Sequence, residues 1–459
     1  MKNKEPLEYG LIPLDETFDQ LEDWWLKSLG DGIGSVRVNL KWAMDSEERE
    51  SVELFHKQVL LMIGAEAKIS GVEEIDLIWS YPTAFPPHIR HEFERLWSEE
   101  SALQQMLKEA GVNLKREGAL EIKNETESVA VCKYSSEFLK AVPGAKERPQ
   151  IVIDIGGGTS DVAIWLKGKM MAQTSIRLAG NILADYLREN DKFREGMAEI
   201  LSIDKKIIDS FTGIRSYVIT SLILKKSESK IFMELPSKAI TPPFKVARSR
   251  IFFSYSAVLY YIGQLLRNLI PKGSSTDCDI FLAGNGARLL KWVSESKATE
   301  KAFVRILRSS VKNNFDLKEI RIVFSQNPKQ EVAIGLLYRP EETGITSTSE
   351  NPIIILGEDG YKSLDVPLSW GTDIYSKPDE LNPDTMHVPS DFPELRNFVD
   401  AYNSEARDLD LIKVTLTPGE IKAGVENYLV KFAARQKQNM ASVQPLFIEE
   451  AKLLLESIK

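Results

Sequence analysis

The sequence predicts a mixed α/β fold in which sheets are flanked by helices. Short apolar runs typical of buried strands recur along the chain, at 75–79, 151–165, 278–284 and 320–325. Longer segments whose apolar residues are spaced three and four apart, as in amphipathic helices, separate these runs. With 459 residues, an apolar fraction of 43% and a charged fraction of 27%, the chain is expected to form about two to four globular domains.

The composition excludes several classes of protein. A net charge of −9 and a pI near 5.4 argue against a dedicated nucleic-acid binder, which normally carries a basic face. Two cysteines, Cys132 and Cys278, and four histidines are too few for a disulfide framework, a four-thiolate zinc site or a histidine-rich metal site. The N-terminal stretch has no apolar core of the signal-peptide kind, so we expect a cytoplasmic protein.

One uncharged run, at 251–266, raises the question of a membrane span. A bilayer requires about 20 apolar residues, and this run is shorter. It also contains Ser254, Ser256 and Gln264. The run therefore predicts a buried core helix and no membrane span.

The first part of the chain is mostly helical in pattern. Apolar spacing predicts helices within 14–110, interrupted in 73–85 by a buried strand that Pro82 stops. The last of these helices, at about 88–110, is expected to end at Gly111, a suitable C-cap.

The chain then divides into further parts. A connecting helix from near Glu125 completes a partial first lobe, 1–142, and the polar, turn-rich stretch at 143–150 is the expected boundary. A second lobe is predicted at 151–340 and a C-terminal extension of unassigned role at 341–459.

Strands and helices alternate in the second lobe. The predicted strands lie at 151–165, where two are joined by a glycine turn, and at 230–235, 278–284 and 320–325; the predicted helices lie in 181–222, 247–270 and 331–338, with another from 287. In the extension, a small β unit around 351–370 and one or two helices from Pro418 onward are expected, separated by a Pro/Asp-rich stretch.

The most informative segment is the glycine turn Asp154-Ile-Gly-Gly-Gly-Thr-Ser-Asp161. Glycines let backbone N–H groups approach phosphate oxygens and tolerate positive φ. Carboxylates beside a polyphosphate make sense if they hold Mg²⁺, in part through its waters, and the Thr159 hydroxyl can donate to a phosphate oxygen. A plain hairpin is the alternative, but three glycines between two aspartates exceed what a hairpin needs. A Rossmann or P-loop site fits worse, because a strand follows the glycines and Gly-Lys-Ser/Thr is absent.

Several segments together resemble the ATPase superfamily of actin, the seventy-kilodalton heat-shock chaperones and the sugar kinases. The glycine turn is similar to the second phosphate motif of that superfamily, and other pieces follow in its order. They are DLIWSYPTAF at 76–85, AGVNL at 110–114, NETESVA at 124–130, RLAGN at 177–181, FLAGNGAR at 281–288 and NPKQEVAIG at 327–335. The pattern is closest to the chaperone and bacterial actin-like ATPase domains. The resemblance covers about residues 70–340 and implies an actin-like ATPase fold with two ribonuclease H-like lobes, the first of them incomplete.

The resemblance implies how phosphates and metal would be held. Asp154 and Asp161 would organise Mg²⁺. The residues that would line the β- and γ-phosphates are Gly156, Gly157, Gly158 and Thr159. Gly180, in the turn after the phosphate hairpin, would face the phosphates from the opposite wall.

The resemblance also implies where the nucleoside and the attacking water lie. Gly284 and Gly286 would let adenine and ribose lie flat on the backbone, with Arg288 near the base, unless Arg288 is only a surface charge in a first helical turn. The water in this superfamily is positioned by a glutamate or glutamine at the start of the connecting helix. Glu127 is the candidate, because Glu127-Ser-Val-Ala130 keeps a glutamate three residues before a small residue, and Glu125 aligns equally well with another chaperone pattern. Either could instead be a first-turn acid favoured by the helix dipole.

The first phosphate motif of the superfamily has no match before residue 70. The nearest candidate, Gly30-Asp-Gly-Ile-Gly-Ser35, follows a helical segment where a strand is required, and the chaperone's catalytic lysine has no counterpart. We expect either that the chain begins within the first lobe of a longer gene product, or that it is a degenerate member that no longer hydrolyses ATP. Loss of one phosphate clamp would remove much of the electrostatic stabilisation on which phosphoryl transfer depends.

The function implied is that of an ATP-binding chaperone-like or actin-like protein. ATP and Mg²⁺ would be its cofactors, and its nucleotide state would control lobe closure and binding of a protein partner, a client or another copy, with slow ATP hydrolysis as a further expectation. The alternatives are a filament-forming actin-like segregation or cytoskeletal protein and a non-catalytic scaffold of the same fold. A sugar kinase is least favoured, since no substrate-binding acid can be located.

Overall fold

The computed structural model describes most of residues 49–139, residues 148–201 with 205 and 209, most of 241–338, and residues 352–436 and 443–459. These residues form two compact units. The first unit holds the described residues within Met1–Tyr81, Phe85–Glu125 and Arg194–Lys226, and the second holds those within Pro82–Ala84, Thr126–Phe193 and Ser227–Lys459. The candidate first motif at 30–35 and the predicted strand at 230–235 lie outside the described residues.

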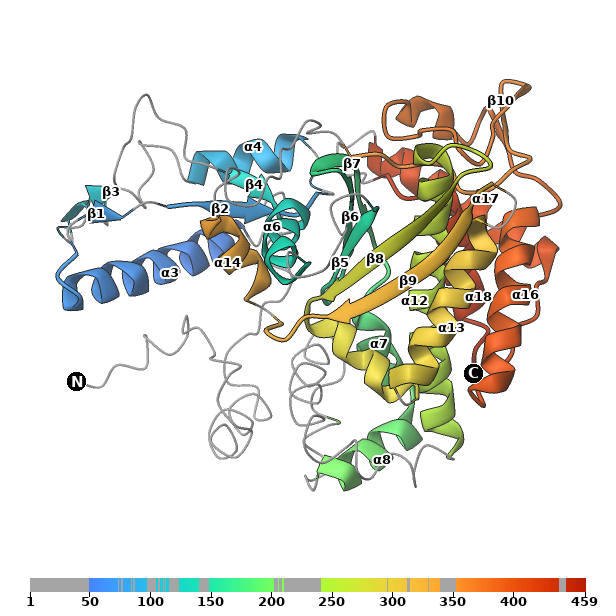
Figure 1. Ribbon diagram of the computed structural model, residues 1–459, viewed down its shortest axis with the longest axis horizontal. Coiled ribbons are helices and arrows are strands. Elements are labelled where there is room, and N and C mark those ends of the chain that lie inside the picture. Colours follow the sequence, from blue (N-terminus) through green and yellow to red (C-terminus); the bar gives the residue numbers. More distant parts are fainter. Residues whose placement is uncertain are drawn as a thin grey trace. The chain divides into compact units, whose positions relative to one another are not determined.

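A five-stranded mixed sheet forms the centre of the second unit (Figure 1). Its strands are β5 (Gln150–Ile155), β6 (Ser160–Leu166), β7 (Lys169–Ile176), β8 (Ser275–Ala283) and β9 (Asp316–Phe324), in the order β7-β6-β5-β8-β9. The strand β6 runs antiparallel to both of its neighbours, β5 and β7, whereas β8 and β9 run parallel to β5. The strands predicted at 151–165, 278–284 and 320–325 are confirmed.

The connections between the strands explain these directions. Short turns join β5 to β6 and β6 to β7, and in the second turn Lys167 and Gly168 both have positive φ, as tight hairpins require. Parallel neighbours need a longer crossover, which is usually helical. Here α12 (Pro242–Leu269) precedes β8, and α13 (Ser296–Val311) connects β8 to β9. The described residues thus confirm the mixed α/β class.

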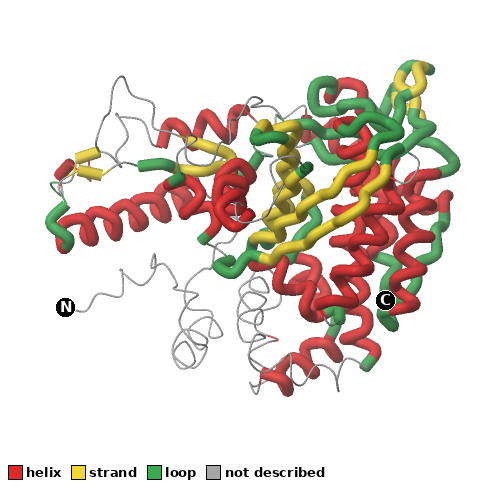
Figure 2. The backbone as a smooth tube through the Cα atoms, viewed as in Figure 1, coloured by secondary structure: helices red, strands yellow, loops and turns green. Residues whose placement is uncertain are grey.

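Helices cover both faces of this sheet (Figure 2). On one face, α6 (Glu127–Leu139) and α14 (Glu331–Leu337) pack against alternate strand residues that include Val152 and Ala163. On the other face, Ile153 packs with residues of α12. Because successive side chains of a strand point to opposite faces, each strand contributes to both layers of the core.

The helix α12 is buried along most of its length. Every position of the uncharged run at 251–266 is buried, including the polar residues Ser254, Ser256 and Gln264. This confirms the predicted core helix. None of the helices in the described part of the chain is long and apolar enough to cross a membrane.

The C-terminal segment packs directly on α12. Its helices are α16 (Pro393–Asp408), α17 (Pro418–Gln436) and α18 (Leu446–Leu455), and before them lie β10 (Lys362–Ser363), β11 (Val366–Pro367), the 3-10 helix η7 (Pro378–Leu381) and β12 (Met386–His387). The ring of Tyr260 in α12 contacts Phe398 of α16 and stacks on Phe447 of α18. The small β unit and the helices from Pro418 onward are confirmed.

The helix α16 was not predicted, because it lies in the Pro/Asp-rich stretch. Pro393 occupies its first turn, where the missing N–H costs nothing. Leu395, Phe398 and Tyr402 are buried at helical spacing. This spacing was the available signal, but the prolines and aspartates around it favoured a loop.

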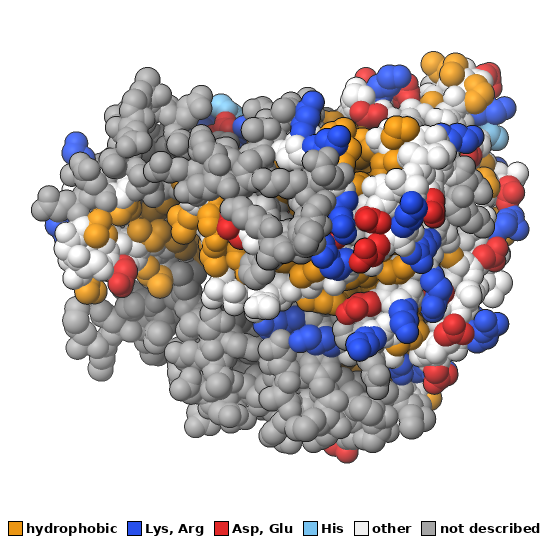
Figure 3. Space-filling model, in the orientation of Figure 1, with side chains coloured by type: hydrophobic (Ala, Val, Ile, Leu, Met, Phe, Trp, Pro, Cys, Tyr) orange, Lys and Arg blue, Asp and Glu red, His pale blue; other side chains and the backbone are white. Residues whose placement is uncertain are grey.

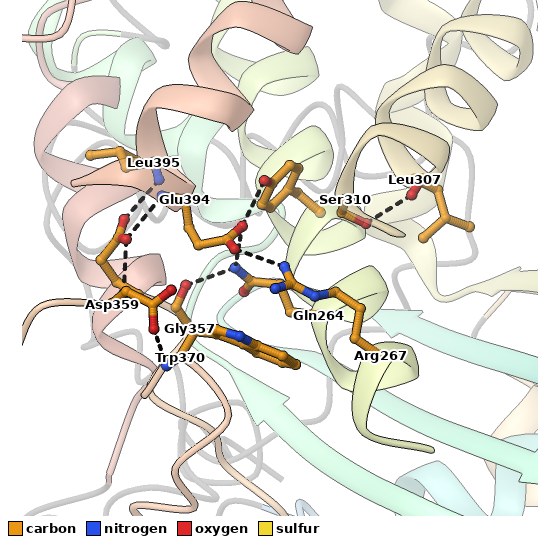
Figure 4. A network of polar contacts seen from close by, with 11 residues as sticks. Gln264, Arg267, Leu307, Ser310, Gly357, Asp359, Trp370, Glu394 and Leu395 are labelled. Carbon is orange, nitrogen blue, oxygen red and sulfur yellow. Dashed lines mark hydrogen bonds and ion pairs between the residues drawn. The ribbon is translucent and has the colours of Figure 1, made fainter. Parts of the chain in front are cut away.

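A buried polar network joins this segment to α12 (Figure 4). The carboxylate of Glu358 accepts hydrogen bonds from the backbone N–H groups of Glu394 and Leu395 at 2.9 and 2.7 Å, at the start of α16. The Glu394 carboxylate pairs with Arg267 at 2.8 Å and accepts a hydrogen bond from the Tyr260 hydroxyl at 2.8 Å. The network therefore fixes the position of the α16 N-terminus on α12.

The first unit is built on the long helix α3 (Arg49–Ile69). Its other elements include β1 (Glu74–Ile75), β2 (Trp79–Tyr81), α4 (Pro87–Leu96), β3 (Asn113–Leu114), most of β4 (Asn124–Thr126) and most of α8 (Asp191–Leu201), with β1 paired to β3 and β2 to β4. Its core holds Val52 and Leu60 of α3 with Trp79, Tyr81 and Phe93. The predicted strand before Pro82 is confirmed.

Charges of both signs are interspersed on the face of the second unit shown in Figure 3. Ion pairs within this unit include Arg305 with Glu405, Arg321 with Asp279, and Lys245 with Asp410.

Candidate nucleotide-binding site

Two aspartates face each other across the β5–β6 hairpin. Asp154 lies directly opposite Asp161 in the strand register, and Asp161 is only 2% exposed. Opposite residues of antiparallel strands point to the same face of the sheet. Because Val152 and Ala163 pack towards α6, strand alternation places both carboxylates on the face that α6 covers. Like charges directly opposite each other in a sheet are destabilising, so a bound cation would favour this arrangement.

Three glycine segments that are far apart in the sequence meet at this hairpin. The helix α7 (Asn181–Glu189) follows Gly180, whose N–H donates to the carbonyl of Gly156 at 3.0 Å. A Cβ on Gly180 would lie 3.6 Å from the Cα of Gly286, and a Cβ on Gly286 would lie 2.8 Å from the oxygen of Gly156. The segments at 156–158, 180 and 284–286 therefore pack backbone against backbone, with no room for a side chain at Gly286.

Gly284 is held even more closely. It follows β8 with a φ of +75°, a conformation that favours glycine. A Cβ there would lie 2.3 Å from Asp154 Oδ1 and 2.5 Å from the oxygen of Ile155. The 3-10 helix η6 (Asn285–Trp292) follows at once, and it carries Arg288, which is half-buried.

Two buried side chains that the sequence analysis did not single out hold the Gly284–Gly286 turn. Glu331, the first residue of α14 and 2% exposed, accepts a hydrogen bond from the Gly284 N–H at 3.2 Å. The Tyr255 hydroxyl of α12 donates to the carbonyl of Gly286 at 2.8 Å, and burial raises the pKa of Tyr255, so the hydroxyl keeps its proton. Glu331 lies in the NPKQEVAIG segment, whose resemblance to a superfamily motif could have marked it as a site residue. Tyr255 lies within an apolar run, and nothing in that run distinguishes it from a core residue.

Two backbone amides of the glycine turn, those of Gly157 and Gly158, have no backbone acceptor among the described residues. The carbonyls of Gly156 and Gly157 accept hydrogen bonds from the N–H groups of Gly180 and Asn181 at 3.0 and 2.7 Å. Within the part of the chain that the structure describes, no backbone carbonyl accepts from the N–H of Gly157 or Gly158, and Gly157 is exposed. Adjacent open amides of this kind form a concave site for anions such as phosphate.

Asn181 is a further residue that the sequence analysis did not assign. Its side-chain amide lies over the glycine turn, because a Cβ on Gly157 would lie 3.2 Å from Asn181 Oδ1 and a Cβ on Gly158 would lie 3.6 Å from Nδ2. Its position, directly after the Leu-Ala-Gly turn and at the start of a helix, could have marked it as a site residue. A side chain here limits the space above the turn.

Glu127 is the first residue of α6 and is half-buried. The preceding Thr126 caps this helix, since its Oγ1 accepts from the N–H of Val129 at 3.3 Å and donates to Gln173 Oε1 at 3.1 Å. Gln173 of β7 lies opposite Ala163, two positions along β6 from Asp161. The start of α6 is thereby fixed on the same face of the sheet as the two aspartates.

The pair of aspartates fits Mg²⁺. This ion prefers oxygen ligands and keeps several of its waters, so it does not need a full set of protein ligands. Asp154 and Asp161 lie opposite each other in the strand register and are the two carboxylates that would hold it. The Thr159 hydroxyl donates to Asp161 Oδ2 at 3.2 Å and so orients that carboxylate.

Comparison with known proteins adds little to this geometry. No protein-family model matches the sequence, and no curated protein matches it. Among solved structures, a match to the crystal structure of the ethanolamine utilization protein EutJ from Carboxydothermus hydrogenoformans covers 62% of this chain and 73% of that chain, with 16% identity and a TM-score of 0.32. A likeness at this score supports no argument about fold, ligand or activity.

Proposed function

We propose that this chain binds an adenine nucleotide together with Mg²⁺, as a member of the actin, seventy-kilodalton chaperone and sugar-kinase ATPase superfamily. The observation that carries the proposal is the meeting of three glycine segments, at 156–158, 180 and 284–286, beside two facing aspartates. A simple hairpin would need neither the second segment nor the third. Backbone without side chains offers the close approach that a polyphosphate and a flat base both require.

The strand arrangement supports this proposal. Three antiparallel strands followed by two parallel ones fit the ribonuclease H-like lobe that the resemblance implies. Asp154 of β5 and Ala283 of β8 are register partners in parallel strands, so the glycine turn and Gly284 follow at the same edge of the sheet. Ligands of open α/β sheets commonly bind at the carboxyl ends of parallel strands.

Each residue has a role in the proposal. The amides of Gly157 and Gly158 hold the phosphates, Gly180 forms the opposite wall, and Asp154 and Asp161 bind Mg²⁺ through its waters. The bound ion neutralises phosphate charge. Arg288 of η6 lies near the base.

Glu127 is proposed to position the water for slow hydrolysis. Its place at the capped start of α6, on the same sheet face as the aspartates, supports this role. Nucleotide state is proposed to control lobe closure and, through it, binding of a protein partner. Pelleting of the pure protein with ATP and Mg²⁺ but not with ADP would indicate self-association, and nucleotide-dependent capture of unfolded peptide would indicate a chaperone-like output.

Titration calorimetry with ATP, with and without Mg²⁺, tests nucleotide binding. We expect tighter binding with Mg²⁺ and much weaker binding of GTP. Gly157→Val should weaken ATP binding by at least about tenfold, since the branched side chain meets the phosphates, and should leave adenosine binding nearly unchanged. An equal loss for the two ligands would mean that the turn only joins strands, and no ATP binding by the wild-type chain would refute the proposal.

Asp154→Asn is expected to reduce the effect of Mg²⁺ on ATP binding. Asparagine keeps the size of the side chain but removes one charge from the metal site, so the gain in affinity on adding Mg²⁺ should fall by about tenfold, and any hydrolysis by a similar factor. The same calorimetric titrations measure this. Asp316→Asn, at the exposed start of β9, is the matched control and should behave as wild type. Unfolding of the Asp154→Asn chain on thermal melting would instead identify this aspartate as a structural residue.

A further inference from the structure

Glu331 connects the Gly284–Gly286 turn to a helix pair on the sheet. Its carboxylate accepts the Gly284 N–H at 3.2 Å, and the side chain is 2% exposed. On its other side, Gly284 lies against Asp154, because a Cβ there would be 2.3 Å from Asp154 Oδ1. Gly284 is thus held between Glu331 and a proposed magnesium-binding carboxylate.

The helix that Glu331 begins packs with backbone contact on α6. A Cβ on Gly335, one turn along α14, would lie 1.8 Å from the carbonyl oxygen of Ala130. Ala130 is fully buried, and Glu127 lies about one turn before it at the start of α6. Packed protein interiors deform little, so a shift of α14 has to move α6 as well.

We propose that Glu331 is a positioning residue that couples occupancy of the Gly284–Gly286 turn to α6 and thereby to Glu127. This inference rests on the proposed nucleotide function. A nucleoside on the turn fixes Gly284, the hydrogen bond passes this restraint to α14, and the contact of Gly335 with Ala130 passes it to α6. The route consists only of direct contacts within the second unit.

Tyr255 provides an internal comparison. Its hydroxyl holds the same turn through the Gly286 carbonyl at 2.8 Å, but it belongs to α12. That helix packs on α13, α16 and α18, whereas α14 packs on α6. The two contacts therefore restrain one turn from two different helices, and only the contact through Glu331 leads directly to α6.

The test compares Glu331 variants that keep or lack an oxygen acceptor for the Gly284 N–H. Glu331→Gln keeps an acceptor oxygen, Glu331→Met keeps the length of the chain but removes the acceptor, and Glu331→Ala removes it without placing an apolar chain beside Gly284. Tyr255→Phe removes the other contact. ATP and adenosine affinities are measured by calorimetry, folding by thermal melting, and restraint of α6 by hydrogen–deuterium exchange of residues 127–139 at saturating ATP and Mg²⁺.

We expect nucleotide to slow exchange in α6 of the wild type and of Glu331→Gln. Glu331→Met and Glu331→Ala should bind both ligands about tenfold more weakly, because the Gly284 amide is left without an acceptor, and should lose the slowing even at saturation. Tyr255→Phe should bind more weakly but keep the slowing.

Two outcomes separate this inference from the proposed function. If the wild type binds ATP and the two acceptor-free variants, once saturated, still show full slowing in α6, the coupling through Glu331 is overturned and nucleotide binding stands. If the wild type binds neither ATP nor adenosine, the proposed function is refuted and the coupling with it.

Discussion

Gly335→Ala is expected to lower the free energy of unfolding of the second unit by about 3 kcal/mol or more. The single added methyl group would lie 1.8 Å from the Ala130 carbonyl oxygen and 2.6 Å from its carbonyl carbon. These atoms belong to the backbone of a buried helix, so they cannot move aside as a flexible side chain would. Urea unfolding followed by far-ultraviolet circular dichroism measures the loss.

Gly419→Ala is the matched control for this substitution. Gly419 lies in the first turn of α17, and a Cβ there would meet no atom within 4 Å. Alanine in a helix is usually more stable than glycine, by up to about 1 kcal/mol. The same chemical change should therefore be harmless or stabilising at Gly419. Equal stability of the two variants would show that α14 and α6 are not in backbone contact.

Glu450→Gln is expected to stabilise the protein at about pH 8 by a few kcal/mol and to change little at about pH 5. Glu450 of α18 is fully buried and accepts a hydrogen bond from the Tyr361 hydroxyl at 2.6 Å. Burial raises the pKa of Glu450 to about 8. Burial, together with the charge of Glu450, also raises the pKa of Glu358 well above its ordinary value.

The sign of the effect follows from proton binding. Between the ordinary carboxyl pKa of 4.5 and about 8, the folded chain holds a proton on Glu450 that the unfolded chain releases. The contribution of Glu450 to the free energy of unfolding is therefore greatest below about pH 4.5. It falls as the pH rises towards 8, by up to about 1.4 kcal/mol per pH unit. Glutamine cannot titrate, so the variant lacks this decline.

Urea midpoints measured between about pH 5 and pH 8.5 provide the test. Glu456→Gln, an exposed position just after α18, should keep the pH dependence of the wild type. If Glu450→Gln shows the same decline as the wild type, Glu450 is not the group that titrates, and Glu358 becomes the next position to replace.

Local sequence was sufficient to predict the hairpin of the candidate site. Apolar strands on either side of three glycines define both the turn and its length, and the length sets Asp154 opposite Asp161. The family resemblance further implied that Gly180, Gly284 and Gly286 belong to the same site as this turn, and the structure brings their backbones together. Glycine explains the close approach, because a Cβ at Gly284 or Gly286 would overlap neighbouring atoms, while the binding roles of these residues stay predictions.

Contacts between distant segments could not be predicted in the same way. Nothing local to Glu331 specifies that its carboxylate accepts the Gly284 amide, since helical periodicity indicates which face is buried but not which partner buries it. The packing of Phe447 on Tyr260 could not be predicted for the same reason. In α16, the turn-forming residues around Pro393 favoured a loop, although Leu395, Phe398 and Tyr402 have the spacing of a buried helix face.

The position of α12 in the chain has a consequence for biosynthesis. The uncharged run at 251–266 leaves the ribosome long before α16 and α18, the helices whose aromatic rings cover Phe253 and Tyr260. At roughly 5 to 20 residues per second, the last of these helices is synthesised about 10 to 40 seconds after this run. An apolar segment exposed on a nascent chain for that time is prone to aggregate and to be held by cellular chaperones. Folding of the second unit is therefore expected to finish only after α18 has been synthesised, and pauses or cleavage before α18 should leave an insoluble product.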